Sequence, residues 1–261
     1  MIIRPGISAL WNEPFPELSA SLDAVLARAP KGMRIFFRAD DIAVPSKLFS
    51  AMIDPFREHE AVLEMAVTPA WLRHDHAAEL LRQCPEASIF RFHQHGWRHA
   101  NHQQSGKKGE FGTDRTKEAK QDDLRKGRDK LSAMLGRRFE PRFTPPWNRF
   151  DTETGEILLG LGYRNVSRSN GEQRKVPLPK ELPDLFINVD LHTRTEASPE
   201  AGRAALLAEL GEAVRTGYCG VMLHHQRMNR HSLVFLDELL AALNRAGIPS
   251  LGFAELLANS D

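Results

Sequence analysis

The sequence predicts an α/β fold in which seven or eight parallel strands, each followed by a helix, close into one barrel. Short apolar runs rich in β-branched and aromatic residues alternate with amphipathic segments along the chain, a pattern typical of strand–helix units and a parallel sheet. A length of 261 residues suits one such barrel. No internal repeat or low-complexity linker divides the chain. We therefore expect residues 1–261 to form a single domain.

The elements follow from these two kinds of segment. The apolar runs predict strands at residues 34–37, 63–67, 88–92, 142–144, 185–189, 220–223 and 248–251, with a weaker signal at 164–166. The amphipathic segments predict helices at residues 46–58, 75–83, 114–135, 152–161, 199–215 and 233–245. Residues 105–130 are the most charged stretch, and Asp122 and Lys126 form a pair four residues apart that supports a solvated helix there.

The composition excludes several classes of protein. Hydrophobic residues make up 41% of the chain and charged residues 26%, as in ordinary globular proteins. The formal net charge of +1 gives no strong attraction to nucleic acid or to an anionic membrane, and we expect neither partner. The first six residues lack the apolar run of a signal peptide, so we expect a cytoplasmic location. Cys84 and Cys219 are expected to be reduced, buried thiols.

Polar residues follow five of the predicted strands directly. The clusters are Asp40-Asp41, His93 to His95, Thr144 to Trp147, Asp190 to His192, and His224-His225. In a barrel of parallel strands, residues just past the strand ends converge on one face, where active sites are found. The five clusters therefore predict a single site on that face.

His95 and His99 are the strongest candidates for metal ligands. Histidines four residues apart on one helical turn lie about 5–6 Å apart at Cβ, so both can bind one ion. One aspartate of the pair Asp40-Asp41 would complete a set of two histidines and one carboxylate with open positions. That ligand set is typical of a catalytic metal rather than a closed structural one.

The neighbours of these histidines leave alternatives open. His93 or His102 could be the real ligand, or could hydrogen-bond a ligand. Trp97 between the two ligands would form a wall that holds the metal turn. The segment Glu110-Phe111-Gly112, at the end of the charged loop, could lie over the site.

Asp40 and Asp41 are adjacent, and adjacent residues in a strand point to opposite faces. Both can serve one site only if the first strand ends near Ala39. One carboxylate could then bind the metal while the other acts as a base. The alternative is that an aspartate ahead of Pro45-Ser46 caps the following helix.

Two further clusters have both a chemical and a structural interpretation. His224 could donate a proton to a leaving group, with Asp190 as the partner that raises its pKa. It could also be a buried histidine at a strand end. The segment 144–148 predicts a rigid turn that presents the indole of Trp147 to a sugar or acyl group, or simply a turn before the next helix.

With the clusters in this order, the chain resembles the polysaccharide deacetylase family, carbohydrate esterase family four. Members of that family have an Asp-Asp motif, His-x3-His, an Arg-Pro-Pro-like motif, an Asp-containing motif and a terminal Leu-x-His motif. The corresponding segments here are 37–41, 95–99, 144–148, Asp190, and Leu223-His224. The resemblance covers residues 34–225, which is most of the chain.

The resemblance implies a distorted (β/α) barrel and an enzyme that removes an acetyl group from an N- or O-acetylated sugar or related amide. It also implies a divalent metal, most often zinc, with Asp41, His95 and His99 as ligands. Asp40 would be the catalytic base and His224 the catalytic acid. We expect Trp147, Pro146, Asp190 and Arg38 to bind a small-molecule or oligosaccharide substrate.

Two positions depart from the family pattern. The family arginine that precedes Pro-Pro and orients the base is Thr144 here, and Arg38 or Arg142 could take its place. The aspartate that usually follows the last-motif histidine is His225. The missing arginine favours an alternative, a non-catalytic relative that binds sugar or acyl ligands. Ferrous oxygenases use the same ligand set, but they usually have all-β folds.

Overall fold

The structure, a computed structural model, describes residues 6–171 and 175–258. Residues 1–5, part of the segment searched for a signal peptide, lie outside this range. The strands are β1 (Arg34–Ile42), β2 (Leu63–Val67), β3 (Phe90–His95), β4 (Phe139–Thr144), β5 (Val189–Asp190) and β6 (Tyr218–Leu223). The α-helices are α1 (Leu18–Leu26), α2 (Lys47–Glu58), α3 (His74–Gln83), α4 (Lys117–Leu135), α5 (Thr152–Gly160), α6 (Pro199–Thr216), α7 (Arg230–Arg245) and α8 (Phe253–Ala258). Short 3-10 helices include η1 (Ala9–Asn12), η2 (Gly136–Arg138), η3 (Pro146–Asn148) and η5 (His225–Arg227).

The six strands form one parallel sheet in the order β4-β3-β2-β1-β6-β5, which confirms the predicted α/β class. Two predicted strands, 164–166 and 248–251, form isolated bridges instead: Val166 pairs with Phe143 of β4, and Ser250 pairs with Ile35 of β1. Further bridges lead from residues 166 and 169 to residues 184 and 187, just before β5.

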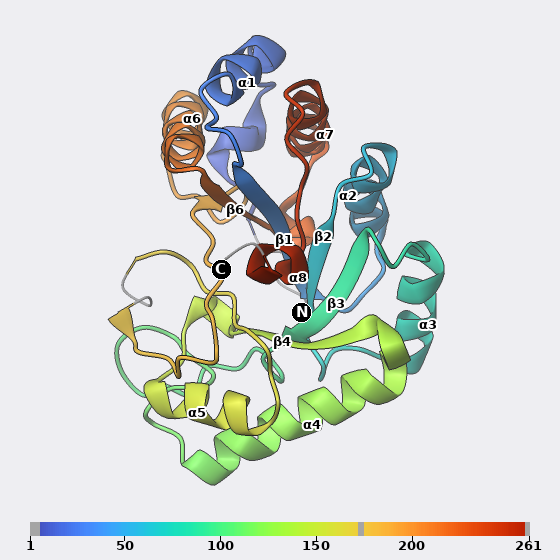
Figure 1. Ribbon diagram of the computed structural model, residues 1–261, viewed down its shortest axis with the longest axis vertical. Coiled ribbons are helices and arrows are strands. Elements are labelled where there is room, and N and C mark those ends of the chain that lie inside the picture. Colours follow the sequence, from blue (N-terminus) through green and yellow to red (C-terminus); the bar gives the residue numbers. More distant parts are fainter. Residues whose placement is uncertain (1–5, 172–174, 259–261) are drawn as a thin grey trace.

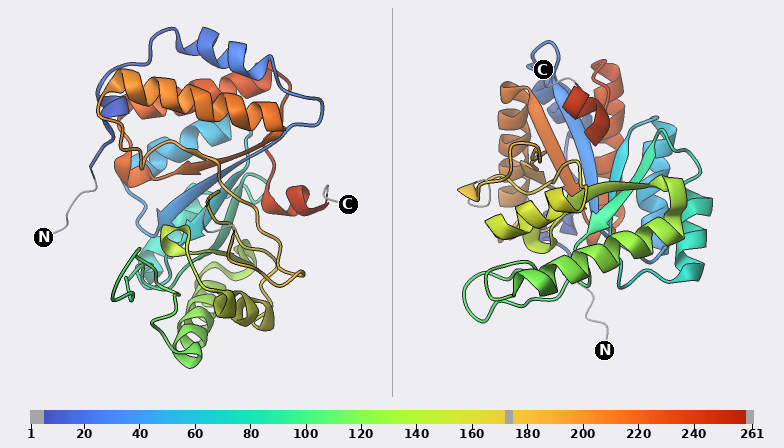
Figure 2. Two further views of the ribbon diagram at one scale, coloured as in Figure 1. Left: turned by 90° about the vertical axis from the view of Figure 1, so that its left-hand side faces the viewer. Right: turned by 60° about the horizontal axis from the view of Figure 1, so that its bottom comes forward.

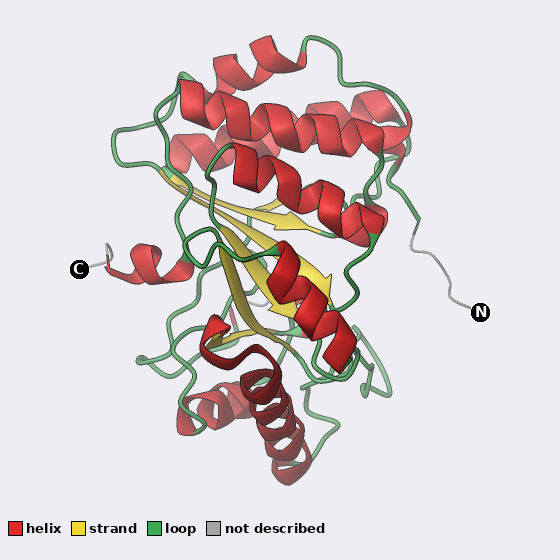
Figure 3. Cartoon of the chain, turned by 90° about the vertical axis from the view of Figure 1, so that its right-hand side faces the viewer, coloured by secondary structure: helices red, strands yellow, loops and turns green. Residues whose placement is uncertain are grey.

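The helices lie outside the sheet. Figure 1 shows α1, α6 and α7 on one side of the molecule and α4 and α5 on the opposite side, and Figures 2 and 3 show the same arrangement from other directions. Four predicted helices begin at side chains that accept a backbone N–H, namely Ser46, Thr116, Asp151 and Ser198. Because Ser46 caps α2, the alternative that Asp40 or Asp41 serves as this cap is wrong. The short helices α1 and α8 were not predicted.

Two apolar clusters pack against the sheet. A cluster that includes Phe36, Met222, Phe253 and Leu256 joins α8 to β1 and β6. The N–H of Leu251 donates to the carbonyl of Ile35, near the start of β1. The larger core fills the space between the sheet and the helices, and it includes Cys84 and Cys219, which are buried free thiols.

Among the described residues, no helix is long and apolar enough to cross a membrane.

Candidate active site

Asp40 and Asp41 are brought to one cavity by a distortion within β1. The strand does not end near Ala39, as we expected, but continues to Ile42. Its pairing with β2 changes register between Ala39 and Ile42, and Asp41 has a φ of 62°. A left-handed residue in a bulge interrupts the alternation of side chains. Both carboxylates therefore line the same cavity, whose volume is about 560 Å³.

His95 and His99 do not share a helical turn, so that part of the prediction is wrong. His95 is the last residue of β3, and His99 lies in the loop that follows. Gly96 and His99 both have a φ of 56°, which turns the loop back on itself. A Cβ at Gly96 would overlap the Glu110 carboxylate and the Pro146 ring. The turn brings the two imidazole centroids to 5.3 Å from each other.

Asp41, His95 and His99 form a group that could hold one metal ion. One possible ligand atom from each lies within 4.8 Å of the others. Asp41 Oδ1 is 3.3 Å from His95 Nε2 and 3.5 Å from His99 Nε2. This oxygen is buried and has no hydrogen-bond partner among the described residues, as expected of an atom whose partner would be a cation. The residues present therefore fit a divalent metal.

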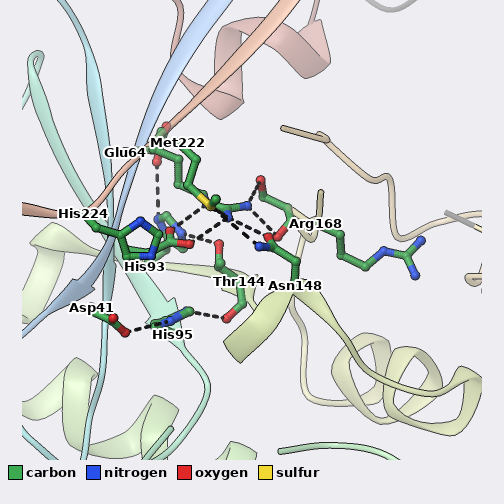
Figure 4. Close-up of polar contacts among 12 residues, drawn as sticks. Asp41, Glu64, His93, His95, Thr144, Asn148, Arg168, Met222 and His224 are labelled. Carbon is green, nitrogen blue, oxygen red and sulfur yellow. Dashed lines mark hydrogen bonds and ion pairs between the residues drawn. The ribbon is translucent and has the colours of Figure 1, made fainter. Parts of the chain in front are cut away.

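A hydrogen bond fixes the orientation of His95. Its Nδ1 lies 3.0 Å from the carbonyl oxygen of Thr144, which accepts the ring proton, and Figure 4 shows this contact on the side of the His95 ring opposite Asp41. With the proton on Nδ1, the lone pair of Nε2 faces Asp41. A second partner that orients a ligand imidazole in this way is usual in metal sites.

Burial and mutual charge shift the pKa values of these three groups. Burial would raise the pKa of Asp41, but the neighbouring histidines, His95 first, outweigh it and hold that pKa well below its usual range. Burial and the charge of His95 lower the pKa of His99 to about 4. Burial would lower the pKa of His95, but the carboxylates of Asp41 and Asp40 raise it above its ordinary value. Asp41 is thus an anion and His99 a neutral imidazole at neutral pH, the states that bind metal.

Glu110 holds the loop that carries His99. Its fully buried carboxylate accepts the N–H groups of Arg98 (2.8 Å), Trp97 (3.1 Å) and Ala100 (3.5 Å). Sequence reasoning placed residues 110–112 only loosely over the site, whereas Glu110 fixes the backbone beneath a candidate ligand. No motif marks this role, because the contact depends on how the two loops pack.

Asp40 is held by Arg38, two residues earlier on β1. Nε and one terminal nitrogen of Arg38 donate to the two carboxylate oxygens at 2.7 and 2.8 Å. Burial would raise the pKa of Asp40, but the Arg38 guanidinium, together with the charges of His95 and His224, outweighs burial and lowers it. Arg38 is fully buried, so it contacts Asp40 rather than lining the cavity where we expected it to bind substrate.

The Arg38 guanidinium also donates to two other segments of the chain. The second terminal nitrogen donates to Ser167 Oγ and to the Ser167 carbonyl, and the terminal nitrogen that contacts Asp40 also donates to Asn148 Oδ1 at 2.7 Å. Arg142, the alternative for the missing family arginine, instead donates to Glu140 and Asn165, at 2.6 Å each. Arg38 is therefore the residue that contacts Asp40.

Thr144 and His93 occupy the region behind the candidate ligands. The Thr144 hydroxyl is 2.9 Å from His93 Nε2, and His93 Nδ1 is 3.6 Å from the buried Glu64 carboxylate. His93 is thus a buried structural neighbour, and neither it nor His102 belongs to the candidate metal group. Trp97 packs against the apolar cluster around Phe143 rather than lining the cavity.

His224 and Asp190 line the side of the cavity formed by β5 and β6. The N–H of His224 donates to His192 Nδ1 at 3.1 Å, and His224 Nδ1 is buried without a partner in the described chain. The Asp190 carboxylate accepts the N–H groups of His192 and Thr193, at 2.9 Å each. The described residues show no hydrogen bond or ion pair between Asp190 and His224. His225 packs edge-on against Phe49 and does not line the cavity.

Trp147 stands beside the candidate ligands as an aromatic wall. It has a φ of 54°, and its ring centroid lies 4.3 Å from that of His99. Pro146 is buried next to Gly96 and does not line the cavity. Sequence reasoning missed Gln226, which lines the cavity and donates to the Asp41 carbonyl at 2.8 Å. The described residues that line the cavity also include Asn148, Arg149 and Arg227.

A parallel α/β fold with an acidic and histidine cluster at its strand ends is found in a known class of proteins. The family model of polysaccharide deacetylase matches residues 28–166, more than half of the chain. The chain therefore belongs to the polysaccharide deacetylase family. No curated protein matches it in sequence.

Three solved structures show the same fold at low identity. A protein described as a polysaccharide deacetylase from Mycobacterium smegmatis has a TM-score of 0.64 and 12% identity, over 88% of this chain and 91% of the other. A structure described as T48 deacetylase with substrate has a TM-score of 0.57 and 14% identity, over 90% and 94%. A family 4 pseudoenzyme from Bacillus anthracis has a TM-score of 0.57 and 15% identity, over 87% and 66%. At these identities the likeness concerns the fold alone.

Proposed function

We propose that this protein is a metal-dependent hydrolase that removes the acetyl group from an N- or O-acetylated sugar or related amide. One observation carries the proposal. A group that fits a divalent metal, Asp41 with His95 and His99, shares its cavity with a second carboxylate, Asp40, which stays outside the metal group. A metal group and a separate base in one cavity are what metal-assisted hydrolysis requires.

Asp41, His95 and His99 would hold the ion, which we propose is zinc. When bound, it would act as a Lewis acid toward the acetyl carbonyl and acidify a bound water. Asp40, kept ionised and oriented by Arg38, accepts a proton from the attacking water. The water oxygen forms a bond to the acetyl carbon while the bond from that carbon to nitrogen or to the ester oxygen breaks. His224 gives a proton to the departing atom, and acetate is released.

The two alternatives have less support. The non-catalytic binder was suggested by the absence of an arginine at Thr144, yet Arg38 supplies a guanidinium to Asp40 from another strand. The ferrous oxygenase shares the ligand set, but membership of the deacetylase family favours hydrolysis. One structural relative is a pseudoenzyme, so turnover has to be measured as well as metal binding.

Elemental analysis tests the proposal directly. The protein would be purified without chelators or metal-affinity resin, beside the variants His95→Ala and His74→Ala. His74, the exposed first residue of α3, is the matched control. We expect about one equivalent of zinc in the parent and in the control, none in His95→Ala, and acetate release from acetylated sugars only where metal is present. Absence of metal in the parent after zinc is supplied, or full metal in His95→Ala, would contradict the proposal.

A further inference from the structure

Two arginine side chains in the cavity wall have no carboxylate partner. Arg149, just after η3, and Arg227, the last residue of η5, both line the cavity. Arg149 donates to the carbonyl of Lys108 at 3.2 Å, and Arg227 donates to the carbonyl of Gly6 at 3.0 Å. Neither guanidinium forms an ion pair with a carboxylate of the described residues. Because a guanidinium carries several N–H donors, most donors of both side chains remain available to a ligand.

The carboxylates that line the same cavity have other partners. Asp40, Asp41 and Asp190 make the contacts described above. The fourth carboxylate, that of Glu209, accepts two nitrogens of Arg194 at 2.7 and 3.0 Å. The two arginines without a carboxylate partner are therefore not explained by a need to neutralise an acid of the cavity wall.

The backbone that leads to Arg149 is held by contacts to β1. Trp147 and Asn148 have φ values of 54° and 59°. Left-handed residues other than glycine persist only where the surrounding structure holds them. Asn148 Oδ1 accepts an N–H of Arg38, the residue that also binds Asp40. Arg149 therefore follows directly on a residue that is tied to the proposed base.

The backbone around Arg227 is held in a similar way. The preceding residue, Gln226, donates to the carbonyl of Asp41 at 2.8 Å. The N–H of Arg227 donates to the carbonyl of His224 at 3.0 Å, which closes the turn after β6. Each of the two arginines thus follows a residue whose side chain is bonded to β1, although one belongs to the loop after β4 and the other to the loop after β6.

We propose that Arg149 and Arg227 bind a negatively charged group of the substrate, so that the substrate is an acetylated sugar that carries a carboxylate or a phosphate. This inference rests on the function proposed above and narrows its substrate class. Guanidinium groups bind both anions through paired N–H donors. A neutral sugar would displace water from the two guanidinium groups without supplying a counter-ion, which would weaken its binding.

The test compares acetylated sugars that differ in charge. Hydrolysis of neutral N-acetylglucosamine, of its 1- and 6-phosphates and of N-acetylglucosaminuronic acid would be measured for the parent, Arg149→Gln, Arg227→Gln and Arg230→Gln. Arg230, the exposed first residue of α7, does not line the cavity and is the matched control. Because the readout is the ratio of kcat/KM for an anionic sugar to that for the neutral sugar, a loss of metal or of folded protein cancels.

We expect the parent to prefer at least one anionic sugar about tenfold or more. Arg149→Gln and Arg227→Gln should each lower that ratio about tenfold, and Arg230→Gln should keep it. Added salt should lower the ratio in the parent, because ions screen the attraction. Preference for a phosphate or for the uronic acid supports the proposal in either case and identifies which anion the cavity takes.

Two outcomes would overturn the anion site. The parent could show no preference for any anionic sugar, or both arginine variants could retain the full preference, which would mean that the metal ion alone binds the anion. Calorimetry on Asp40→Asn, alone and combined with Arg149→Gln or Arg227→Gln, measures the same ratio for binding without turnover. Arginine-dependent binding of an anionic sugar without hydrolysis of any sugar by the parent would overturn the proposed reaction and leave the anion site in place.

Discussion

Both carboxylate oxygens of Asp40 are held by a single side chain, that of Arg38, on the same strand. Residues two apart in a strand point to the same face, so the sequence Arg38-Ala39-Asp40 is enough to bring the pair together. The family pattern takes its base-orienting arginine from the position of Thr144 on β4. In this chain β1 supplies both members of the pair. Thr144 instead contacts His93 through its hydroxyl and His95 through its carbonyl oxygen.

The arginine prediction concerns Arg38 and Arg142. Arg38→Ala should lower turnover about 100-fold, because Asp40 loses its orientation, and should also cost about 3–5 kcal/mol in the free energy of unfolding. Arg38→Lys should fold better and recover part of the rate. Arg142→Ala, which removes an equally buried arginine from Glu140 and Asn165, should lose stability without a comparable loss in kcat. Equal kcat values for the Arg38 and Arg142 variants at matched folded fraction would refute the assignment.

The two adjacent aspartates should behave differently. Asp40→Asn should keep the metal and lose turnover about 10²–10⁴-fold, because the base is gone. Asp41→Asn should lose the metal itself, because Asp41 provides the carboxylate of the candidate group. Zinc content and the rate of acetate release, measured on the same preparations, distinguish the two. Retention of full activity in Asp40→Asn would show that another group accepts the proton.

Glu110 should control metal affinity without touching the metal. Glu110→Ala removes the acceptor for three N–H groups of the loop that carries His99. We expect zinc affinity, measured by competition with a chelator, to fall about 10–100-fold. Asp114→Asn is the control, since Asp114 accepts only the exposed N–H of Gln104 in this region. An unchanged zinc affinity in Glu110→Ala would contradict this role, because it would mean that the loop holds His99 equally well without Glu110.

Two buried histidines should make the fold sensitive to mild acid. Burial lowers the pKa of His225 to about 4 and the pKa of His192 well below its usual range, and the nearby His224 opposes protonation of both. Arg227 also faces His192, and Asp41 opposes part of the shift at His225. The unfolded chain binds protons at these positions below pH ~6.5, whereas the folded chain does not. The free energy of unfolding should therefore fall as the pH drops from ~6.5 toward ~4.

The variant His192→Asn separates the contribution of His192 from that of His225. Asparagine keeps an oxygen acceptor near the place of Nδ1, which accepts the N–H of His224. Denaturant titrations across this pH range should give a slope smaller by up to ~1.4 kcal/mol per pH unit in the variant. If the smaller side chain also lowers the free energy of unfolding by an amount that does not depend on pH, the whole curve of free energy against pH shifts, and the difference in slope is unchanged. Parallel curves would mean that His192 titrates normally in the folded protein.

Much of the site could be predicted from sequence because its residues follow strands. Burial of apolar runs places Asp40, His95 and His224 at or near the carboxyl ends of their strands, and parallel pairing brings those ends together. The residue pattern also named Arg38 as one of two candidates to replace the family arginine. These inferences depend only on the periodicity of apolar residues and on the order of the polar clusters along the chain.

The rest of the site depends on contacts that no periodicity encodes. The pattern could not reveal the bulge at Asp41 or the left-handed turn at His99, because each is stabilised by packing against distant segments. Two such contacts are those of Glu110, which accepts an N–H of the loop that carries His99, and of Gln226, which donates to the Asp41 carbonyl. The spacing His-x3-His is equally compatible with a helix, which is why the predicted helical turn was wrong.

The position of β1 between β2 and β6 has a consequence for biosynthesis. Residues 34–39 pair with residues 218–223, so a growing chain exposes one edge of its central strand until residues 218–223 have been synthesised. Such long-range pairing slows folding, and an unpaired edge promotes aggregation. The carboxylates of β1 also cannot meet His224 before that late pairing. We expect nascent chains that stop before β6 to depend on chaperones and to lack a formed active centre.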